Sequence, residues 1–386
     1  MNTPLLQLLA IAVVLAAGCA TTDEPQDLAP GERPAIHTDE AGLWMLSDKY
    51  EQSVISSGRL VNDPDLNEYV TDIVCRIAPL MCSDIRTYIV DTPHFNATMS
   101  PNGFMQVWTG LILRADNEAQ LAYILGHEVS HFVRRHSVTI WRDYRNKSSV
   151  MAYFTLVTAL GGGGYSANLA QLLALSSVFA FSRDQEREAD DLGLNMMVAA
   201  GYDPHEAVRI WQSLEVEREA EDEDEPSIFF ATHPSTKERV ALLRERASAG
   251  PDRIRPPLRN DSEFLALTAS NRFKWLRDEV RLRRFDATEV LLKRLLARGD
   301  SPAELSYFLG EVYRLSGEEA NRRKAVDSYL VAIDTGKAPA ETHRSLGLVY
   351  RKLGEAEMAR RSFQNYLTVA TEADDRDMVE TYLNDI

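Results

Sequence analysis

The pattern His127-Glu128-Val129-Ser130-His131 has the spacing of a metal site on a helix, and the other motifs of the chain are organised around it. Residues four apart on an α-helix stand one turn above each other, so His127 and His131 present their imidazoles to one point. Two neutral imidazoles at this spacing suit Zn²⁺, and Glu128 is placed to deprotonate a metal-bound water. The same pattern also arises by chance in helices that bind no metal.

The surrounding residues predict that this segment is helical. Asn117 is a suitable N-cap, and Gln120 follows it three residues later, as in a capping box. Apolar residues recur at helical spacing, and two cations stand in the last turn, where they favour the negative end of the helix dipole. These residues are Leu121, Leu125 and Phe132, then Arg134 and Arg135.

A second acidic motif, Glu186-Arg187-Glu188-Ala189-Asp190, follows downstream. Glu186 and Asp190 are again four apart on a predicted helix, on its most apolar face, and buried carboxylates need a cation or strong donors. A catalytic zinc site takes three protein ligands, so we expect Glu186 to be the third ligand. Asp190 is then the acceptor that orients a ligating histidine. The alternative, a solvated acidic face, suits Glu188 better.

Three stretches together carry a family resemblance: residues 117–136 (NEAQLAYILGHEVSHFVRRH), 182–193 (SRDQEREADDLG) and 232–239 (THPSTKER). They resemble the HtpX-like zinc metallopeptidases, which include the CAAX-prenyl endopeptidases. The resemblance covers roughly residues 41–250 and is strongest to the soluble envelope branch that carries tetratricopeptide (TPR) repeats. It implies a zincin-type domain with one Zn²⁺ per chain, with Glu186 as third ligand.

The third stretch contributes two further candidate site residues, His233 and Arg239. His233 is interpreted in three ways: it stabilises the oxyanion, it occupies the open zinc position when substrate is absent, or it only caps the next helix. Arg239 is expected to pair with Asp190 or Glu186. The remaining histidines show no partner pattern and are interpreted as structural or exposed, namely His94, His136, His205 and His343.

The predicted fold class is α+β, mainly α. Residues 41–80 are expected to be helical, with Asp63-Pro64 opening a helix that runs to about Ile77. Strands are expected at 86–90, 96–99 and 104–108, the last two joined by the turn Ser100-Pro101-Asn102-Gly103. In the family an edge strand binds extended substrate, which this hairpin would supply, although it could also only pack against the zinc helix.

The N-terminus is predicted to be a lipoprotein signal over residues 1–18, followed by Cys19 as the lipidated residue and a flexible tether over 19–40. A plain cleaved signal is the alternative. Ala20 favours the outer membrane of a Gram-negative bacterium, by analogy with lipoprotein sorting. Two cysteines remain, Cys75 and Cys82, and in such a compartment they form either a disulfide or two buried thiols.

Composition and apolar runs limit the other possibilities. The net charge is −16, so a nucleic-acid partner is not expected. Acids gather in 215–225, which is interpreted as a solvated loop. The apolar runs 150–160 and 169–181 flank four glycines, and each is too short to span a bilayer. They are interpreted as an amphipathic hairpin over the cleft.

The C-terminal part repeats. After a proline-rich linker at 251–262, the pattern Leu309-Gly310-x-x-Tyr313 recurs as Leu346-Gly347-x-x-Tyr350, and Ala325 and Tyr329 recur as Ala359 and Phe363. The offsets, about one TPR period, predict an all-α TPR-like array over 263–386. Such arrays stack into a partner-binding surface.

Together these features predict a zinc-dependent endopeptidase domain at 41–250 in the periplasm, anchored to the outer membrane through Cys19. By resemblance, its substrates are unfolded or misassembled envelope proteins, and its array contacts the outer-membrane assembly machinery. The alternative is a TPR scaffold or chaperone in which proteolysis is secondary or latent. The predicted metal ligands are His127, His131 and Glu186, and the predicted catalytic residues are Glu128, His233, Asp190 and Arg239.

Overall fold

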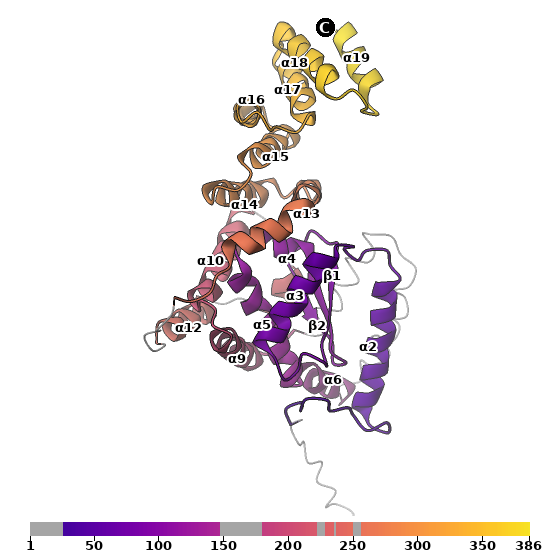
Figure 1. The fold of residues 1–386 in the computed structure, drawn as a ribbon, viewed down its shortest axis with the longest axis vertical. Coiled ribbons are helices and arrows are strands. Elements are labelled where there is room, and N and C mark those ends of the chain that lie inside the picture. The colour runs from indigo at the N-terminus through magenta and orange to yellow at the C-terminus, as the bar shows by residue number, and fades with distance from the viewer. Residues whose placement is uncertain (1–25, 147–179, 222–227, 235–236, 250–255) are drawn as a thin grey trace, which may run out of the picture.

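The computed structural model describes residues 26–146, 180–221, 228–234, 237–249 and 256–386. They form a helical body around a small sheet, and a row of helices extends from one end of this body (Figure 1). None of the helices in these parts of the chain combines the length and the apolar character needed to cross a bilayer. The predicted signal, Cys19 and nearly all of the predicted hairpin at 150–181 lie outside the described residues.

Two helices open the body, α2 (Asp39–Ile55) and α3 (Pro64–Ile77). The N-terminus of α3 is as predicted: the Asp63 side chain accepts a hydrogen bond from the backbone N–H of Leu66 at 3.1 Å, and Pro64 occupies the first turn. Cys75, in the last turn of this helix, is joined by a disulfide to Cys82 beyond its C-terminal end. Of the two possibilities for these cysteines, the structure contains the disulfide.

The sheet has three strands in the order β1-β3-β2, with bounds Arg86–Val90 (β1), Ala97–Met99 (β2) and Phe104–Trp108 (β3). β2 and β3 form the predicted antiparallel hairpin, and Gly103 in its turn has φ +85°, which glycine adopts readily. β1 pairs with β3 in parallel. β3 is central and fully buried, while β2 is an edge strand that packs beside the helix of the His127 motif.

The remaining helices of the body surround that motif. Their bounds are α4 (Thr109–Arg114), α5 (Glu118–Val133), α6 (His136–Asn146), α9 (Arg183–Ala199), α10 (His205–Ala220), α11 (Ile228–Thr232) and α12 (Lys237–Ser248). The interpretation of 215–225 as a solvated loop is wrong for its first part, because α10 continues to Ala220. Glu217 is buried there, since it pairs with Arg114 on α4 at 2.7 Å.

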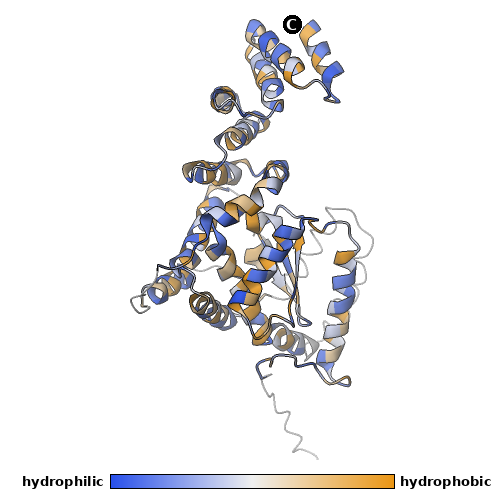
Figure 2. Cartoon of the chain, viewed as in Figure 1, coloured by the Kyte–Doolittle hydropathy of each residue, from blue (hydrophilic) through white to orange (hydrophobic). Residues whose placement is uncertain are grey.

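The extended row consists of successive helices joined by short connections. Their bounds are α13 (Asp261–Arg281), α14 (Phe285–Ala297), α15 (Pro302–Leu315), α16 (Glu319–Asp334), α17 (Glu341–Leu353), α18 (Ala356–Val369) and α19 (Arg376–Asn384). Figure 2 shows hydrophobic and hydrophilic residues interleaved along them, as in amphipathic helices that bury one face. The mainly helical fold with a small sheet and a helical C-terminal region agrees with the predicted class.

Matching glycines show that the sequence repeat is also a packing repeat. A Cβ added at Gly310 would lie 2.4 Å from the Tyr329 ring, and one at Gly347 would lie 2.6 Å from the Phe363 ring. Both distances are far below van der Waals contact, so only glycine lets each helix pair approach this closely. The α15–α16 and α17–α18 pairs are thus equivalent units.

The first helix pair of the row, α13–α14, is joined to the body by buried ion pairs. Arg114 donates to Glu217 and to Glu279, each at 2.7 Å, and Arg294 of α14 reaches Glu217 at 3.1 Å. Arg114 is 2% exposed and the Glu279 side chain is fully buried. We call this set the joint network; its members are Arg114, Asp116, Glu217, Glu279, Arg284 and Arg294.

Part of the predicted tether is also fixed to the body. Leu28 is 5% exposed, and its backbone N–H donates to the carbonyl oxygen of Val133 at 2.8 Å. Asp27 pairs with Arg134 at 2.6 Å. The prediction of a flexible tether over 19–40 is therefore wrong for this part, because one apolar side chain and an acid find partners at the C-terminal end of α5.

Candidate metal centre

His127 and His131 lie one turn apart on α5, and their Nε2 atoms are 3.1 Å apart. The Asn117 side chain caps α5 by accepting a hydrogen bond from the backbone N–H of Gln120 at 3.0 Å, as the sequence predicts. α9 packs closely on this helix because a glycine faces it. A Cβ at Gly193 would lie 2.7 Å from the backbone nitrogen of His127. The two motif helices therefore approach almost backbone to backbone.

Glu186 on α9 completes the group. Its Oε1 atom lies 3.4 Å from His131 Nε2 and 2.9 Å from His233 Nδ1. One ligand atom from each of four buried residues lies within 4.8 Å of the others, the residues being His127, His131, Glu186 and His233. Tetrahedral zinc with bonds of about 2.0–2.1 Å separates neighbouring donors by roughly 3.3 Å. The donor set and its spacing therefore fit zinc.

The charge balance of the site also favours a cation. Three buried carboxylates meet here, those of Glu128, Glu186 and Asp190, while Arg239 is the guanidinium that contacts two of them. Burial lowers the pKa of His131 well below its usual value, which favours a neutral imidazole. If the three acids are ionised and the histidines neutral, as binding of a metal requires, one arginine leaves two negative charges, which a divalent cation would neutralise.

Asp190 and Arg239 lie where the sequence places them. Asp190 Oδ1 is 3.1 Å from His127 Nδ1, a contact that directs the other ring nitrogen, Nε2, towards the site. Arg239 donates to both oxygens of Asp190 at 2.7 Å and also contacts Glu186. Burial would raise the pKa of Asp190, but the Arg239 guanidinium lowers it overall. Tyr123 donates to the same carboxylate at 2.9 Å.

His131 has an orienting partner that the sequence analysis missed, His136. The Nδ1 atoms of His131 and His136 are 2.8 Å apart, and His136 Nε2 is 3.2 Å from Glu188. If Glu188 accepts from His136 Nε2–H, then His136 Nδ1 accepts from His131 Nδ1–H, and His131 Nε2 stays free for a metal. The interpretation of His136 as a residue without a partner pattern is wrong.

The reason for this miss is the backbone between α5 and α6. Arg135 has φ +54°, a left-handed conformation that reverses the chain and returns His136 to His131. The sequence spacing of five does not match helical neighbours, so periodicity gave no signal. Phe181 was also missed as part of the site; its ring stacks on His131 with the centroids 3.7 Å apart.

His233 follows the short helix α11, and its ring stacks on Phe229 at 4.7 Å. This contact turns the imidazole into the site. His233 Nδ1 is 3.2 Å from His127 Nε2, and its Nε2 is 3.4 Å from Glu128 Oε1. Burial would lower the pKa of His233, but the nearby carboxylates of Glu186 and Glu128 raise it overall. The alternative interpretation of His233 as a cap of the next helix involves residues 235–236, which lie outside the described residues.

The carboxylates of Glu128 and Glu186 differ in their surroundings. Burial raises the pKa of Glu128, and its Oε1 accepts no hydrogen bond from the described residues. Burial would raise the pKa of Glu186 too, but His233 and hydrogen bonds from His131 and His233 hold it well below its usual value. Glu186 thus stays ionised as a ligand must, while Glu128 is able to carry a proton.

Part of this chain is similar in sequence to known proteins. Residues 62–247, slightly less than half of the 386-residue chain, match Peptidase family M48. The beta-barrel assembly-enhancing protease of Escherichia coli (strain K12) is 26% identical over 231 residues, which cover 56% of this chain and 45% of that relative. The mitochondrial metalloendopeptidase OMA1 of Schizosaccharomyces pombe is 32% identical over 181 residues, covering 46% of this chain and 52% of the relative.

The matches extend to a plant relative, the mitochondrial metalloendopeptidase OMA1 of Arabidopsis thaliana, at 33% identity over 161 residues, 41% of this chain and 30% of that protein. The chain spans about half or less of the length of the curated relatives it matches. The matched family is a peptidase family, and the names of these relatives are those of proteases.

Proposed function

From the match of residues 62–247 to a zinc peptidase family, we propose that this chain is a zinc-dependent endopeptidase of the bacterial cell envelope. The observation that carries the proposal is the buried donor cluster of His127, His131, Glu186 and His233 with Glu128 beside it. We assign His127, His131 and Glu186 as the zinc ligands, one ion per chain. The enzyme is proposed to hydrolyse peptide bonds in unfolded or misassembled envelope proteins.

In the reaction, Glu128 moves the protons. Its buried carboxylate accepts a proton from the attacking water and gives it to the leaving amine, a role that suits a carboxyl group with a raised pKa. When bound, zinc supplies a Lewis acid that polarises the peptide carbonyl and makes water more acidic. Asp190 and His136 hold the imidazoles of His127 and His131 in the orientation that leaves each Nε2 atom free.

For His233 we propose the latent role. Its Nδ1 atom lies 3.2 Å from His127 Nε2 and 2.9 Å from Glu186 Oε1, so in this conformation it would occupy the position that the attacking water needs. Catalysis then requires the ring to withdraw from the cluster. The competing proposal is that a withdrawn His233 stabilises the oxyanion.

The edge strand β2 is proposed to bind substrate. It packs against α5, and its partner strand β3 covers only one of its edges. An extended peptide added to the other edge would gain main-chain hydrogen bonds and pass beside His127 and His131. This arrangement suits unfolded chains, which are free to adopt an extended conformation.

The setting of the enzyme rests on the relatives and on the sequence. The name of the E. coli relative points to the assembly of β-barrel proteins. We propose a similar setting here, with a periplasmic location, a lipid anchor at Cys19 and contacts to the outer-membrane assembly machinery through a TPR-like array. A scaffold role for that array, with proteolysis secondary, is compatible with the same contacts.

Zinc content and hydrolysis of an unfolded model protein test the enzymatic proposal. We expect about one zinc per chain in the wild type and in Glu128→Gln, with hydrolysis reduced about 10²- to 10⁴-fold in Glu128→Gln, as for loss of a general base. His131→Ala and Glu186→Gln should lose both zinc and activity. Asp184→Asn is the matched control, because this acid lies on the same helix as Glu186 with a side chain 91% exposed. Normal zinc content in Glu186→Gln would reject the ligand assignment.

His233→Ala separates the two roles of that residue. The latent role predicts unchanged zinc content and faster basal hydrolysis, since the fourth position becomes open to water. The oxyanion role predicts hydrolysis slower by roughly 10²-fold, as for loss of one oxyanion donor. A variant indistinguishable from wild type would reject both.

A further inference from the structure

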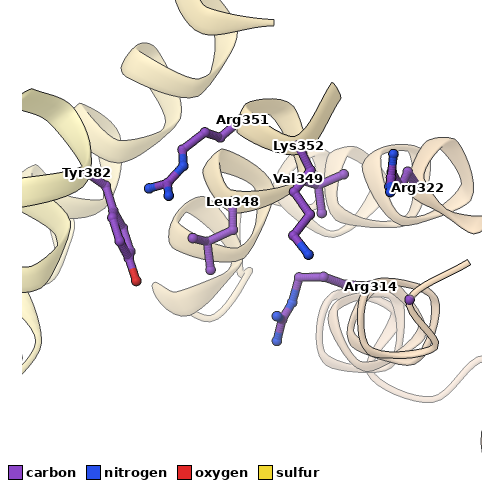
Figure 3. A pocket seen from close by; sticks show the side chains of 8 residues that line it. Arg314, Arg322, Leu348, Val349, Arg351, Lys352 and Tyr382 are labelled. Carbon is purple, nitrogen blue, oxygen red and sulfur yellow. The ribbon is translucent and has the colours of Figure 1, made fainter. Parts of the chain in front are cut away.

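The helical array contains a pocket that the proposed proteolysis does not use. It has a volume of about 310 Å³ and lies between α15, the start of α16, α17 and α19. Figure 3 shows Leu348, Arg351 and Lys352 of α17 between Tyr382 on one side and Arg322 on the other, with Arg314 below them. The pocket is distant in the chain from every residue of the metal centre.

The lining of this pocket is unusually basic. Four cations face it, from Arg314, Arg322, Arg351 and Lys352, and none of its lining residues is acidic. The whole chain carries a net charge of −16, so the pocket concentrates positive charge on an acidic protein. Fields of this kind attract ligands of the opposite sign and repel others.

The cations are only partly neutralised by the protein itself. Arg314 is held by the buried Glu311, with Nε to Oε1 at 3.1 Å, and this contact fixes its guanidinium. Arg322 has only a distant contact of 3.7 Å to Glu319, whose side chain is 87% exposed. Within the described part of the chain, Lys352 forms no ion pair. Such weak exposed contacts contribute little, so these charges remain free to meet a ligand.

The floor of the pocket is apolar. Leu348, Val349 and the Tyr382 ring line it, and Arg351 lies over that ring at 4.6 Å, so its position is fixed. A ligand that fills the pocket must therefore carry carboxylates for the rim and an apolar side chain for the floor. Phosphate or nucleic acid would meet the cations but would leave the floor uncovered.

We propose that this pocket binds an acidic peptide segment of a partner protein, in which glutamate or aspartate side chains flank a large apolar residue. The apolar residue packs on Leu348 and Tyr382, and the flanking carboxylates meet Arg351 and Lys352 on one side and Arg322 on the other. The site does not depend on catalysis, so it can be tested in protein that does not hydrolyse peptides.

The test is fluorescence anisotropy with the full chain carrying Glu128→Gln. The probe is a short labelled peptide, acetylated and amidated, that alternates glutamate with leucine and phenylalanine; its glutamine analogue is the neutral control. We expect saturable binding of the acidic peptide that weakens with added salt. Arg351→Glu/Lys352→Glu should weaken it about tenfold or more, since each reversal replaces an attraction with a repulsion.

Control variants make the result specific to the pocket. Arg361→Glu reverses an exposed charge on α18 outside the pocket and should change the affinity less than about twofold. Lys352→Glu alone spares the contact of Arg351 with Tyr382, so it guards against misfolding of the double variant. Equal binding of the glutamine peptide, or a Lys352→Glu protein that binds as tightly as Arg361→Glu, would overturn the proposal.

Discussion

Two regions that each bring several buried charges together differ in how those charges are paired: the metal centre between α5 and α9 and the joint network between α4, α10, α13 and α14. In the joint network each buried acid has two arginine partners: Glu217 pairs with Arg114 and Arg294, and Glu279 with Arg114 and Arg284. In the metal centre three carboxylates share one arginine. The buried acids of the joint network are thus fully paired with arginines, whereas in the metal centre one guanidinium contacts two carboxylates and no arginine of the described residues contacts Glu128.

This difference separates a structural joint from a functional site. Buried ion pairs offset the cost of desolvation only when each charge has a partner of good geometry. The joint network meets this condition within the protein. The metal centre does not, and its carboxylates stand beside histidines, a ligand set that is suited to zinc. The number of unpaired buried charges thus indicates where an ion is expected.

The largest effect is expected from removing the partners of the joint network altogether. A chain that ends at residue 250 loses α13 and α14, which exposes Arg114 and Glu217 and the apolar surface that Trp275 and Leu276 cover. We expect this chain to lose cooperative unfolding in circular dichroism. A chain that ends at Asp300 keeps the network and should unfold cooperatively. A well-folded shorter chain would instead support the domain boundary at 251–262 that the sequence predicts.

Removing the central cation of each region should have different consequences. Arg114→Met leaves Glu217 and Glu279 buried without it and should lower the free energy of unfolding by about 3–5 kcal/mol, with or without zinc. Arg239→Met leaves Glu186 and Asp190 without their arginine partner and should also lower the free energy of unfolding. Here added zinc should restore part of the lost stability, because it brings positive charge. Denaturant titrations with zinc and with a chelator measure both. If zinc restored the stability of Arg114→Met to the same extent, the proposed difference between the two regions would be contradicted.

The pH dependence of stability tests the joint network alone. Burial would raise the pKa of Glu279, but Arg114 and Arg284 lower it to about 2. A lowered folded-state pKa means that the stabilisation is complete above the unfolded value near 4.5 and disappears as the pH falls towards 2. Near neutral pH, the free energy of unfolding of the wild type should therefore exceed that of Glu279→Gln by roughly 3 kcal/mol. The difference should shrink below pH 4.5, and a difference independent of pH would argue against this contribution.

Local signals predicted most of the fold. The N-caps Asp63 and Asn117 and the turn at Gly103 act through contacts a few residues apart, so their sequence patterns sufficed. The extension of α10 through an acidic run was not predictable in this way, because Glu217 is stabilised by Arg114 and Arg294, which are distant in the sequence. The contact of Leu28 with the C-terminal end of α5 was not predictable either, because its backbone N–H donates to Val133, which is distant in the sequence.

The same distinction between local and distant contacts applies to the candidate site. The pairs His127–His131 and Glu186–Asp190 each have a spacing of four on one helix, so their common face was predictable. Family resemblance, rather than spacing, indicated His233. His136 was not predicted by either route, because its approach to His131 depends on the left-handed backbone at Arg135.

The smallest predicted effect concerns this missed residue. His136 would hold the Nδ1–H of His131, and loss of such an outer partner typically weakens metal binding about 10- to 100-fold. We expect His136→Ala to lower zinc affinity within this range in competition with a chelating dye, while the protein stays folded. His205→Ala is the control, since His205 is exposed at the start of α10 and outside the donor cluster.

His136→Gln sharpens the test, because a glutamine amide offers an acceptor oxygen that can take over the hydrogen bond from His131. Partial recovery of zinc affinity in His136→Gln would identify the hydrogen bond, rather than the packing of the ring, as the cause. The same recovery should extend to hydrolysis, since a correctly oriented His131 restores the ligand geometry. If His136→Ala binds zinc as tightly as His205→Ala, then His131 is oriented by its stacking on Phe181 instead.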